Sequence, residues 1–186
     1  MRANGRVGGW FDTRVVHTEH SYNYKLRGTW LTPDVIRASA RITQLAEGLN
    51  DDETLELVWE AENRGDTVIL VEIDPREGSG IIPRDWAAFL RKKSDGEAGP
   101  AVRGVNQPDL RAVKALSGTE RRDYSYDVFW LVFPLVTSNG ELLFGDQDEE
   151  AELVVRIGGR EGRVSWPIPR SIRDRARESR SKGGTP

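Results

Sequence analysis

The 186-residue chain contains no cysteine and only two histidines. Without cysteine it forms neither disulfides nor thiolate metal sites, and it has no cysteine nucleophile. The histidines lie together in His17-Thr18-Glu19-His20, three residues apart rather than the four that place two zinc ligands on one helix face. A Ser-His-Asp triad would have to use this segment, because no other histidine exists. We therefore predict that the protein is not an enzyme.

Long apolar runs are also scarce. The longest, residues 128–136, suits a buried strand but is far shorter than the roughly 20 residues of a membrane-spanning helix. The first 23 residues contain charges but no apolar segment typical of a signal peptide. The sequence therefore predicts no transmembrane segment, and it predicts either a cytoplasmic protein or one whose leader has been removed.

Basic residues are concentrated at the C-terminal end of the chain. The formal net charge is −3, yet residues 170–186 contain six basic residues against two acidic ones. The rest of the chain is therefore acidic, which argues against a nucleic-acid partner. Beyond Ile172 the tail has almost no apolar residue, and this composition predicts a disordered basic tail.

Alternation of apolar and polar residues dominates the middle of the chain. In residues 54–63, Leu55, Leu57 and Trp59 alternate with glutamates, a period of two that is typical of a half-buried strand. Residues 35–48 also alternate and are predicted to be an opening strand, with a helix as the alternative. Further strands are predicted at 67–74, 123–135, 151–157 and 163–169.

Two local features complete the expected architecture. The tripeptide Arg64-Gly65-Asp66 lies between two predicted strands, and we interpret it as a bend in the chain rather than an adhesion motif. Residues 83–93 are predicted to form one short helix, because Pro83 suits a first turn and Trp86, Phe89 and Leu90 form an apolar stripe.

The pattern as a whole predicts a mostly β protein, an antiparallel β-sandwich with one short helix at about 83–93. We expect three parts: an N-terminal arm at 1–30 that is partly docked, the sandwich at 31–169, and the disordered basic tail at 170–186. Pro167 and Pro169 cannot donate ladder hydrogen bonds, so the last strand is expected at an edge.

Two segments resemble the immunoglobulin-like modules of bacterial envelope proteins. Residues 57–74, "LVWEAENRGDTVILVEID", are similar to the strand–turn–strand pattern of those modules. Residues 115–130, "ALSGTERRDYSYDVFW", are similar to their lead into a strong strand, with Ser117 where proline is usual. The resemblance implies an immunoglobulin-like sandwich and a non-catalytic binding or assembly module of a bacterial cell envelope with a protein partner. It favours an envelope location if a leader has been removed.

Acidic loops give the main alternative. Carboxylates spaced two apart can converge on Ca²⁺, which takes six to eight oxygen ligands. This alternative is a Ca²⁺-responsive domain, and a less favoured one is a hydrolase that uses paired carboxylates. The candidate calcium ligands are Asp146, Asp148, Glu150, Asp51 and Asp52.

Aromatic residues near the N-terminus give a candidate interaction surface. No predicted strand accounts for all of them, and exposed aromatic residues commonly mark interfaces. The residues are Trp10, Tyr22, Tyr24 and Trp30.

Overall fold

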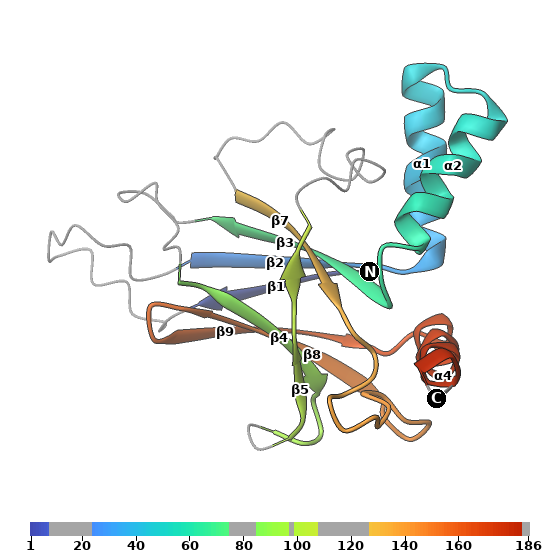
Figure 1. Ribbon diagram of the computed structural model, residues 1–186. Coiled ribbons are helices and arrows are strands. Elements are labelled where there is room, and N and C mark those ends of the chain that lie inside the picture. The colour runs from blue at the N-terminus through green and yellow to red at the C-terminus, as the bar shows by residue number, and fades with distance from the viewer. Residues whose placement is uncertain (8–23, 75–84, 97–98, 108–126, 184–186) are drawn as a thin grey trace, which may run out of the picture.

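A computed structural model describes residues 1–7, 24–74, 85–96, 99–107 and 127–183. These residues form a single antiparallel sheet, a helical hairpin and a C-terminal helix (Figure 1). The strands are β1 (Arg2–Val7), β2 (Tyr24–Leu31), β3 (Thr67–Asp74), β4 (Ala87–Lys92), β5 (Ala101–Arg103), β6 (Val105–Asn106), β7 (Asp127–Phe133), β8 (Glu150–Ile157) and β9 (Arg160–Pro167). The helices are α1 (Pro33–Glu47), α2 (Asp51–Glu62) and α4 (Arg170–Gly183).

The sheet is rolled until its two ends meet. Its strand order is β5-β4-β8-β9-β1-β2-β3-β7-β6, so β5 and β6 are the outermost strands. These two strands follow one another in the chain with only Gly104 between them. The Gly104 N–H donates to the Ala88 carbonyl at 2.9 Å, and the Gln107 N–H donates to the Trp130 carbonyl at 2.7 Å. One short segment thus joins both ends of the sheet, which is nearly barrel-shaped.

The main core lies inside the rolled sheet. Trp30 is fully buried there, and its indole N–H donates to the Thr67 hydroxyl at 2.7 Å. This bond satisfies the one polar group that burial of the indole would otherwise leave unpaired. The Trp30 ring packs against Phe144 and Trp166, with centroid separations of 6.0 and 5.7 Å. Gly28 leaves the space for Trp166, since a Cβ there would lie 2.6 Å from its ring.

Helix α4 packs against this core instead of forming a disordered tail. Ile172 and Ala176 are one helical turn apart, and both are fully buried within the main core. The prediction of disorder at 170–186 is therefore wrong for residues 170–183. Ile172 and Ala176 pack one face of the helix on the core. The many charged residues of the segment made these two apolar residues hard to recognise from the sequence.

The two segments predicted as strands at 35–48 and 54–63 are helices. The Thr32 hydroxyl caps α1, and Gly48 ends it in the left-handed conformation at φ 69°. Asn50 and Glu53 form a capping box at the start of α2. The helix-capping residues at the ends of these segments, and not the alternating pattern between them, match the observed structure. The helix given as the alternative for 35–48 is confirmed, and the strand predicted at 54–63 is wrong.

Two further local predictions are wrong. Of the helix predicted at 83–93, the structure describes residues 85–93, and these contain strand β4 and no helix, with Ala88 and Leu90 buried on the inner side of the sheet. Strand β9 lies between β8 and β1 and not at an edge, and Pro167 is its last residue.

The broader fold class is confirmed, since the protein is mostly β and its strand pairs are antiparallel. An immunoglobulin-like sandwich is not confirmed, because the described strands form one rolled sheet. The segment 1–30 is not an arm beside a domain: β1 and β2 are paired strands of that sheet, and residues 8–23 lie outside the described part.

Candidate functional site

The helices α1 and α2 form a hairpin inserted between two neighbouring strands. Strands β2 and β3 pair directly, with Leu31 opposite Val68 at the point where the chain leaves the sheet. A connection between such strands commonly needs about two to five residues. Here residues 32–66 make the connection, and the hairpin stands away from the sheet (Figure 1). Strand pairing therefore does not require the hairpin.

The base of the hairpin is packed firmly on the outer side of the sheet. Ile36 of α1 and Ala61 of α2 are both 2% exposed. They form a second core cluster, separate from the one inside the sheet, so the hairpin projects from an anchored base. The other buried members of this cluster are Leu31, Val68, Leu70 and Trp130.

Polar contacts fix the two helices against each other. Near the base, the Arg37 guanidinium lies 3.3 Å from the Glu62 carboxylate. Near the tip, the Gln44 side-chain amide donates to Asp51 Oδ1 at 2.8 Å. These two contacts set an antiparallel register in which the last turns of α1 lie beside the first turns of α2.

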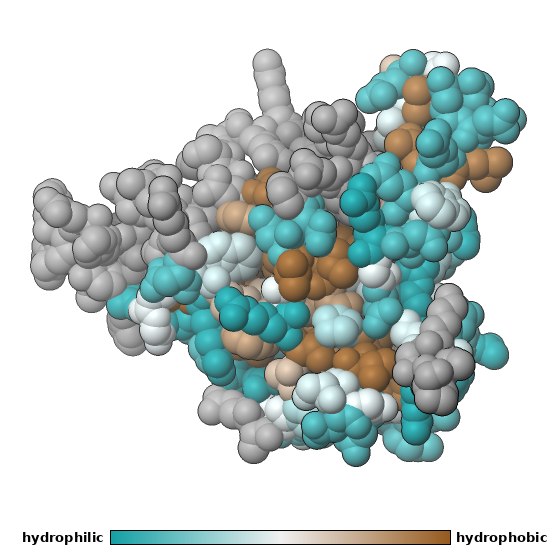
Figure 2. All heavy atoms as spheres, viewed as in Figure 1, coloured by the Kyte–Doolittle hydropathy of each residue, from teal (hydrophilic) through white to brown (hydrophobic). Residues whose placement is uncertain are grey.

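Large apolar side chains are exposed on this hairpin. Ile42 and Leu45 of α1 are 48% and 70% exposed, and Leu55 and Trp59 of α2 are 65% and 66% exposed. In the part of the chain that the structure describes, Val105 is the only comparably exposed aliphatic residue outside the hairpin. We call the four hairpin residues the apolar hairpin surface. The space-filling view shows apolar residues on the hairpin among hydrophilic ones (Figure 2).

Carboxylates surround the α2 part of the apolar hairpin surface. Helix α2 has six acidic residues and no basic one. Asp52 and Glu56 are exposed, and their spacing from Leu55 and Trp59 places all four side chains on one helix face. This face therefore combines apolar area with negative charge.

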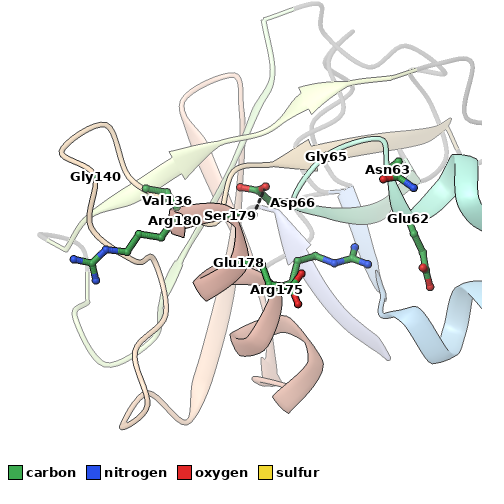
Figure 3. A pocket seen from close by; sticks show the side chains of 10 residues that line it. All are labelled: Glu62, Asn63, Gly65, Asp66, Val136, Gly140, Arg175, Glu178, Ser179 and Arg180. Carbon is green, nitrogen blue, oxygen red and sulfur yellow. Dashed lines mark hydrogen bonds between the residues drawn. The ribbon is translucent and has the colours of Figure 1, made fainter. Parts of the chain in front are cut away.

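A pocket of about 680 Å³ lies beside the base of the hairpin (Figure 3). Asp66 lines it and accepts two hydrogen bonds, from the Leu135 N–H at 2.8 Å and from the Ser179 hydroxyl at 2.6 Å. The lining residues, all described by the structure, include no histidine, lysine or cysteine that would serve as a base or nucleophile. They are Glu62, Asn63, Gly65, Asp66, Val136, Gly140, Arg175, Glu178, Ser179 and Arg180.

The pocket also explains the Arg64-Gly65-Asp66 tripeptide. It bends the chain between α2 and β3, rather than between two strands. Its Asp66 carboxylate accepts hydrogen bonds from the Leu135 N–H, just after β7, and from the Ser179 hydroxyl of α4. Arg64 pairs with Glu60 one helical turn earlier. Both charged groups of the tripeptide thus have contacts within this chain.

The predicted calcium ligands lie in two places. Asp148 accepts the Gly145 N–H at 2.6 Å and lies 3.3 Å from the Lys92 ammonium. Asp146 pairs with Arg177, and a hydrogen bond from Lys93 to Glu150 raises the pKa of that lysine. Asp51 and Asp52 instead begin α2 at the hairpin tip. Within the described ranges, no group of three or more acidic or histidine side chains is arranged to hold a metal ion.

The predicted aromatic surface is wrong where the structure describes it. Trp30 is fully buried and Tyr24 is 5% exposed, so both belong to the main core. Trp10 and Tyr22 lie outside the described residues. Among the described tryptophans, the exposed one is Trp59, which the strand prediction placed on the buried face. The Asn50–Glu53 capping box and the four-residue spacing of Leu55 and Trp59 were the signals that could have identified it.

Comparisons with known proteins supply no assignment for this surface. Searches against protein-family models, curated proteins and solved structures found no match. None of the helices in the described segments is long and apolar enough to cross a membrane. The hairpin and the pocket must therefore be judged on their geometry and chemistry alone.

Proposed function

We propose that this protein is a non-catalytic binding module that docks a protein partner on the apolar hairpin surface. The observation that carries the proposal is the exposure of Leu45, Leu55 and Trp59, each about two-thirds, on a hairpin that strand pairing does not require. Leu55 and Trp59 lie four residues apart on one face of α2, and exposed apolar area on a protein commonly marks an interaction site.

The construction of the hairpin supports this role. Its base is buried on the sheet and its caps and interhelical contacts fix the helices, so little conformational entropy is lost when a partner binds. Trp59 is the type of residue that most often dominates binding energy at protein interfaces. The pocket beside α4 supports catalysis less well, because the Ser179 hydroxyl is bonded to Asp66, which also accepts the Leu135 N–H, and no histidine or lysine lines the pocket beside them.

The resemblance of residues 57–74 and 115–130 to immunoglobulin-like envelope modules adds a setting to the proposal, although residues 57–62 lie in α2 and not in a strand. In this proposal the module belongs to a bacterial cell envelope and takes part in assembly there. The docking role of the hairpin surface does not depend on that setting.

The docking proposal is tested with three crosslinking variants of the full chain. A photo-crosslinking amino acid is placed at Leu45 in the native background and in a Leu55→Ser/Trp59→Ser background, and at Val105 as the matched exposed control. We expect one defined adduct from Leu45, its loss in the double variant, and no equivalent adduct from Val105. Equal crosslinking from Leu45 and Val105 would show that the hairpin is not a docking surface.

A further inference from the structure

The charge of the hairpin indicates the chemistry of the partner that docks on it. We infer that the segment docked on the apolar hairpin surface is a cationic amphipathic helix, and this inference rests on the docking function proposed above. It requires two properties of the partner, an apolar stripe and flanking basic residues.

The apolar stripe follows from the side chains on the hairpin. Ile42 and Leu45 lie on α1, and Leu55 and Trp59 lie four residues apart on α2. The Gln44–Asp51 bond places the last turns of α1 beside the first turns of α2. An amphipathic helix that lies along such a surface contributes apolar residues at three- and four-residue spacing, which is a recurring mode of peptide recognition.

The basic residues follow from the uneven charge of the two helices. Helix α1 is balanced, with Asp34 and Glu47 against Arg37 and Arg41. Helix α2 has six carboxylates and no basic residue. A partner that covers Leu55 and Trp59 therefore also lies over the exposed carboxylates of Asp52 and Glu56. Basic side chains match that charge, whereas acidic ones are repelled.

The same charge argues against other occupants. A second copy docked hairpin to hairpin would bring two acidic α2 helices together. An anionic lipid surface would likewise meet like charge. Among the described segments, α4 is the basic amphipathic helix, but its apolar residues Ile172 and Ala176 are fully buried in the main core. The charge of α2 therefore points to a basic helix from another protein.

The test measures binding of two synthetic peptides to the full chain by fluorescence anisotropy. One is an 18-residue Leu/Lys amphipathic helix, and the other is its Leu/Glu counterpart with the same apolar stripe. At 1.5 Å per residue an 18-residue helix is about 27 Å long, slightly longer than the 15-residue helix α1 on which part of the surface lies. We expect the Leu/Lys peptide to bind at least about tenfold more tightly than the Leu/Glu peptide. Its affinity falls as salt rises, because exposed charge pairs are screened.

Two pairs of variants locate the binding. Leu55→Ser/Trp59→Ser and Asp52→Lys/Glu56→Lys are each expected to weaken the Leu/Lys peptide about tenfold or more. Their controls are matching changes at exposed positions outside the hairpin. Val105→Ser removes an exposed apolar side chain, and Glu141→Lys reverses an exposed acidic charge. The controls keep native affinity, and circular dichroism confirms that every variant retains its helices.

Several results would overturn the inference. They are equal binding of both peptides, equal binding by the hairpin variants and their controls, hairpin-dependent self-association in sedimentation equilibrium, or hairpin-dependent binding to phosphatidylglycerol vesicles. If the Leu/Lys peptide fails while the Leu45 crosslink to a partner still depends on Leu55 and Trp59, the inference about partner chemistry is wrong and the docking function stands. If the crosslink also loses that dependence, both are wrong.

Discussion

The C-terminal helix α4 and the hairpin helix α2 treat their apolar residues in opposite ways. Helix α4 is strongly basic and has few apolar side chains, yet Ile172 and Ala176 are fully buried against the main core. Helix α2 is acidic and richer in apolar residues, yet Leu55 and Trp59 remain about two-thirds exposed. The amount of apolar character in a helix thus does not decide whether it is structural. What decides is whether another element reaches its apolar face.

The largest expected effect tests the structural side of this comparison. Ile172→Ala removes a fully buried side chain that joins α4 to the core and leaves a cavity, so we expect unfolding to become easier by about 2–5 kcal/mol. Chemical denaturation measures the change, with Leu45→Ala as the exposed control. Similar losses for both variants would mean that α4 and the hairpin do not differ in this way.

A smaller effect is expected where the end of the hairpin meets α4. Asp66→Ala leaves the Leu135 N–H and the Ser179 hydroxyl without their partner, and we expect a loss of about 1–3 kcal/mol. Ser179→Ala removes one of these bonds and is expected to cost less. In a double-mutant cycle the two changes should be non-additive, because they share a contact. Strict additivity would show that the Asp66–Ser179 bond contributes nothing.

On the hairpin itself we expect almost no effect on stability. Trp59→Ser changes a side chain that is 66% exposed, so the free energy of unfolding should shift by no more than about 0.5 kcal/mol. Thermal and chemical unfolding of the variant provide the measurement. A loss as large as that of Ile172→Ala would assign Trp59 to packing, and the comparison between α2 and α4 would fail.

A comparably small effect concerns a surface ion-pair group outside both helices, on strand β9. Hydrogen bonds from Arg156 and Arg163 lower the pKa of Glu161 below its ordinary value of 4.5. A lowered folded-state pKa stabilises the protein above that value, and the contribution is lost as the pH falls through the folded-state pKa. Because the Glu161 side chain is still 30% exposed, the pairs are screened by solvent and Glu161→Gln should cost less than about 1 kcal/mol at pH 7. The melting temperatures of the two proteins should converge as the pH falls through the lowered folded-state pKa of Glu161; a constant difference would contradict the assignment.

Sequence reasoning was most successful for strands whose residues are buried on both faces. The apolar stretch at 67–74 is β3, buried along its whole length, and the alternation of Leu153, Val155 and Ile157 matches the inner face of β8. It failed where a helix placed apolar residues at alternate positions. Leu55, Leu57 and Trp59 fit a period of two, but the capping box at Asn50 and Glu53 was the better guide. Within α4, a stripe of only two apolar residues was too weak to be recognised.

The candidate surface was even less accessible to sequence reasoning. Trp30 on β2 and Trp59 on α2 are the same residue type, and one is fully buried while the other is exposed. The difference arises because Trp30 lies on the inner side of β2, where Phe144 and Trp166 surround it, whereas no described element covers Trp59. Contacts among residues so far apart in the chain cannot be read from local pattern.

The sequence alone determined the absence of thiol chemistry, the mostly antiparallel β character and the acidic charge of residues 51–62, because each follows from residue identity or from the period of a short segment. The tertiary structure decided that the sheet rolls on itself through Gly104, that α4 is anchored by Ile172 and Ala176, and that Leu55 and Trp59 face solvent. These features depend on which elements, far apart in the chain, pack against each other. Burial results from that packing and is not fixed by the identity of a single residue.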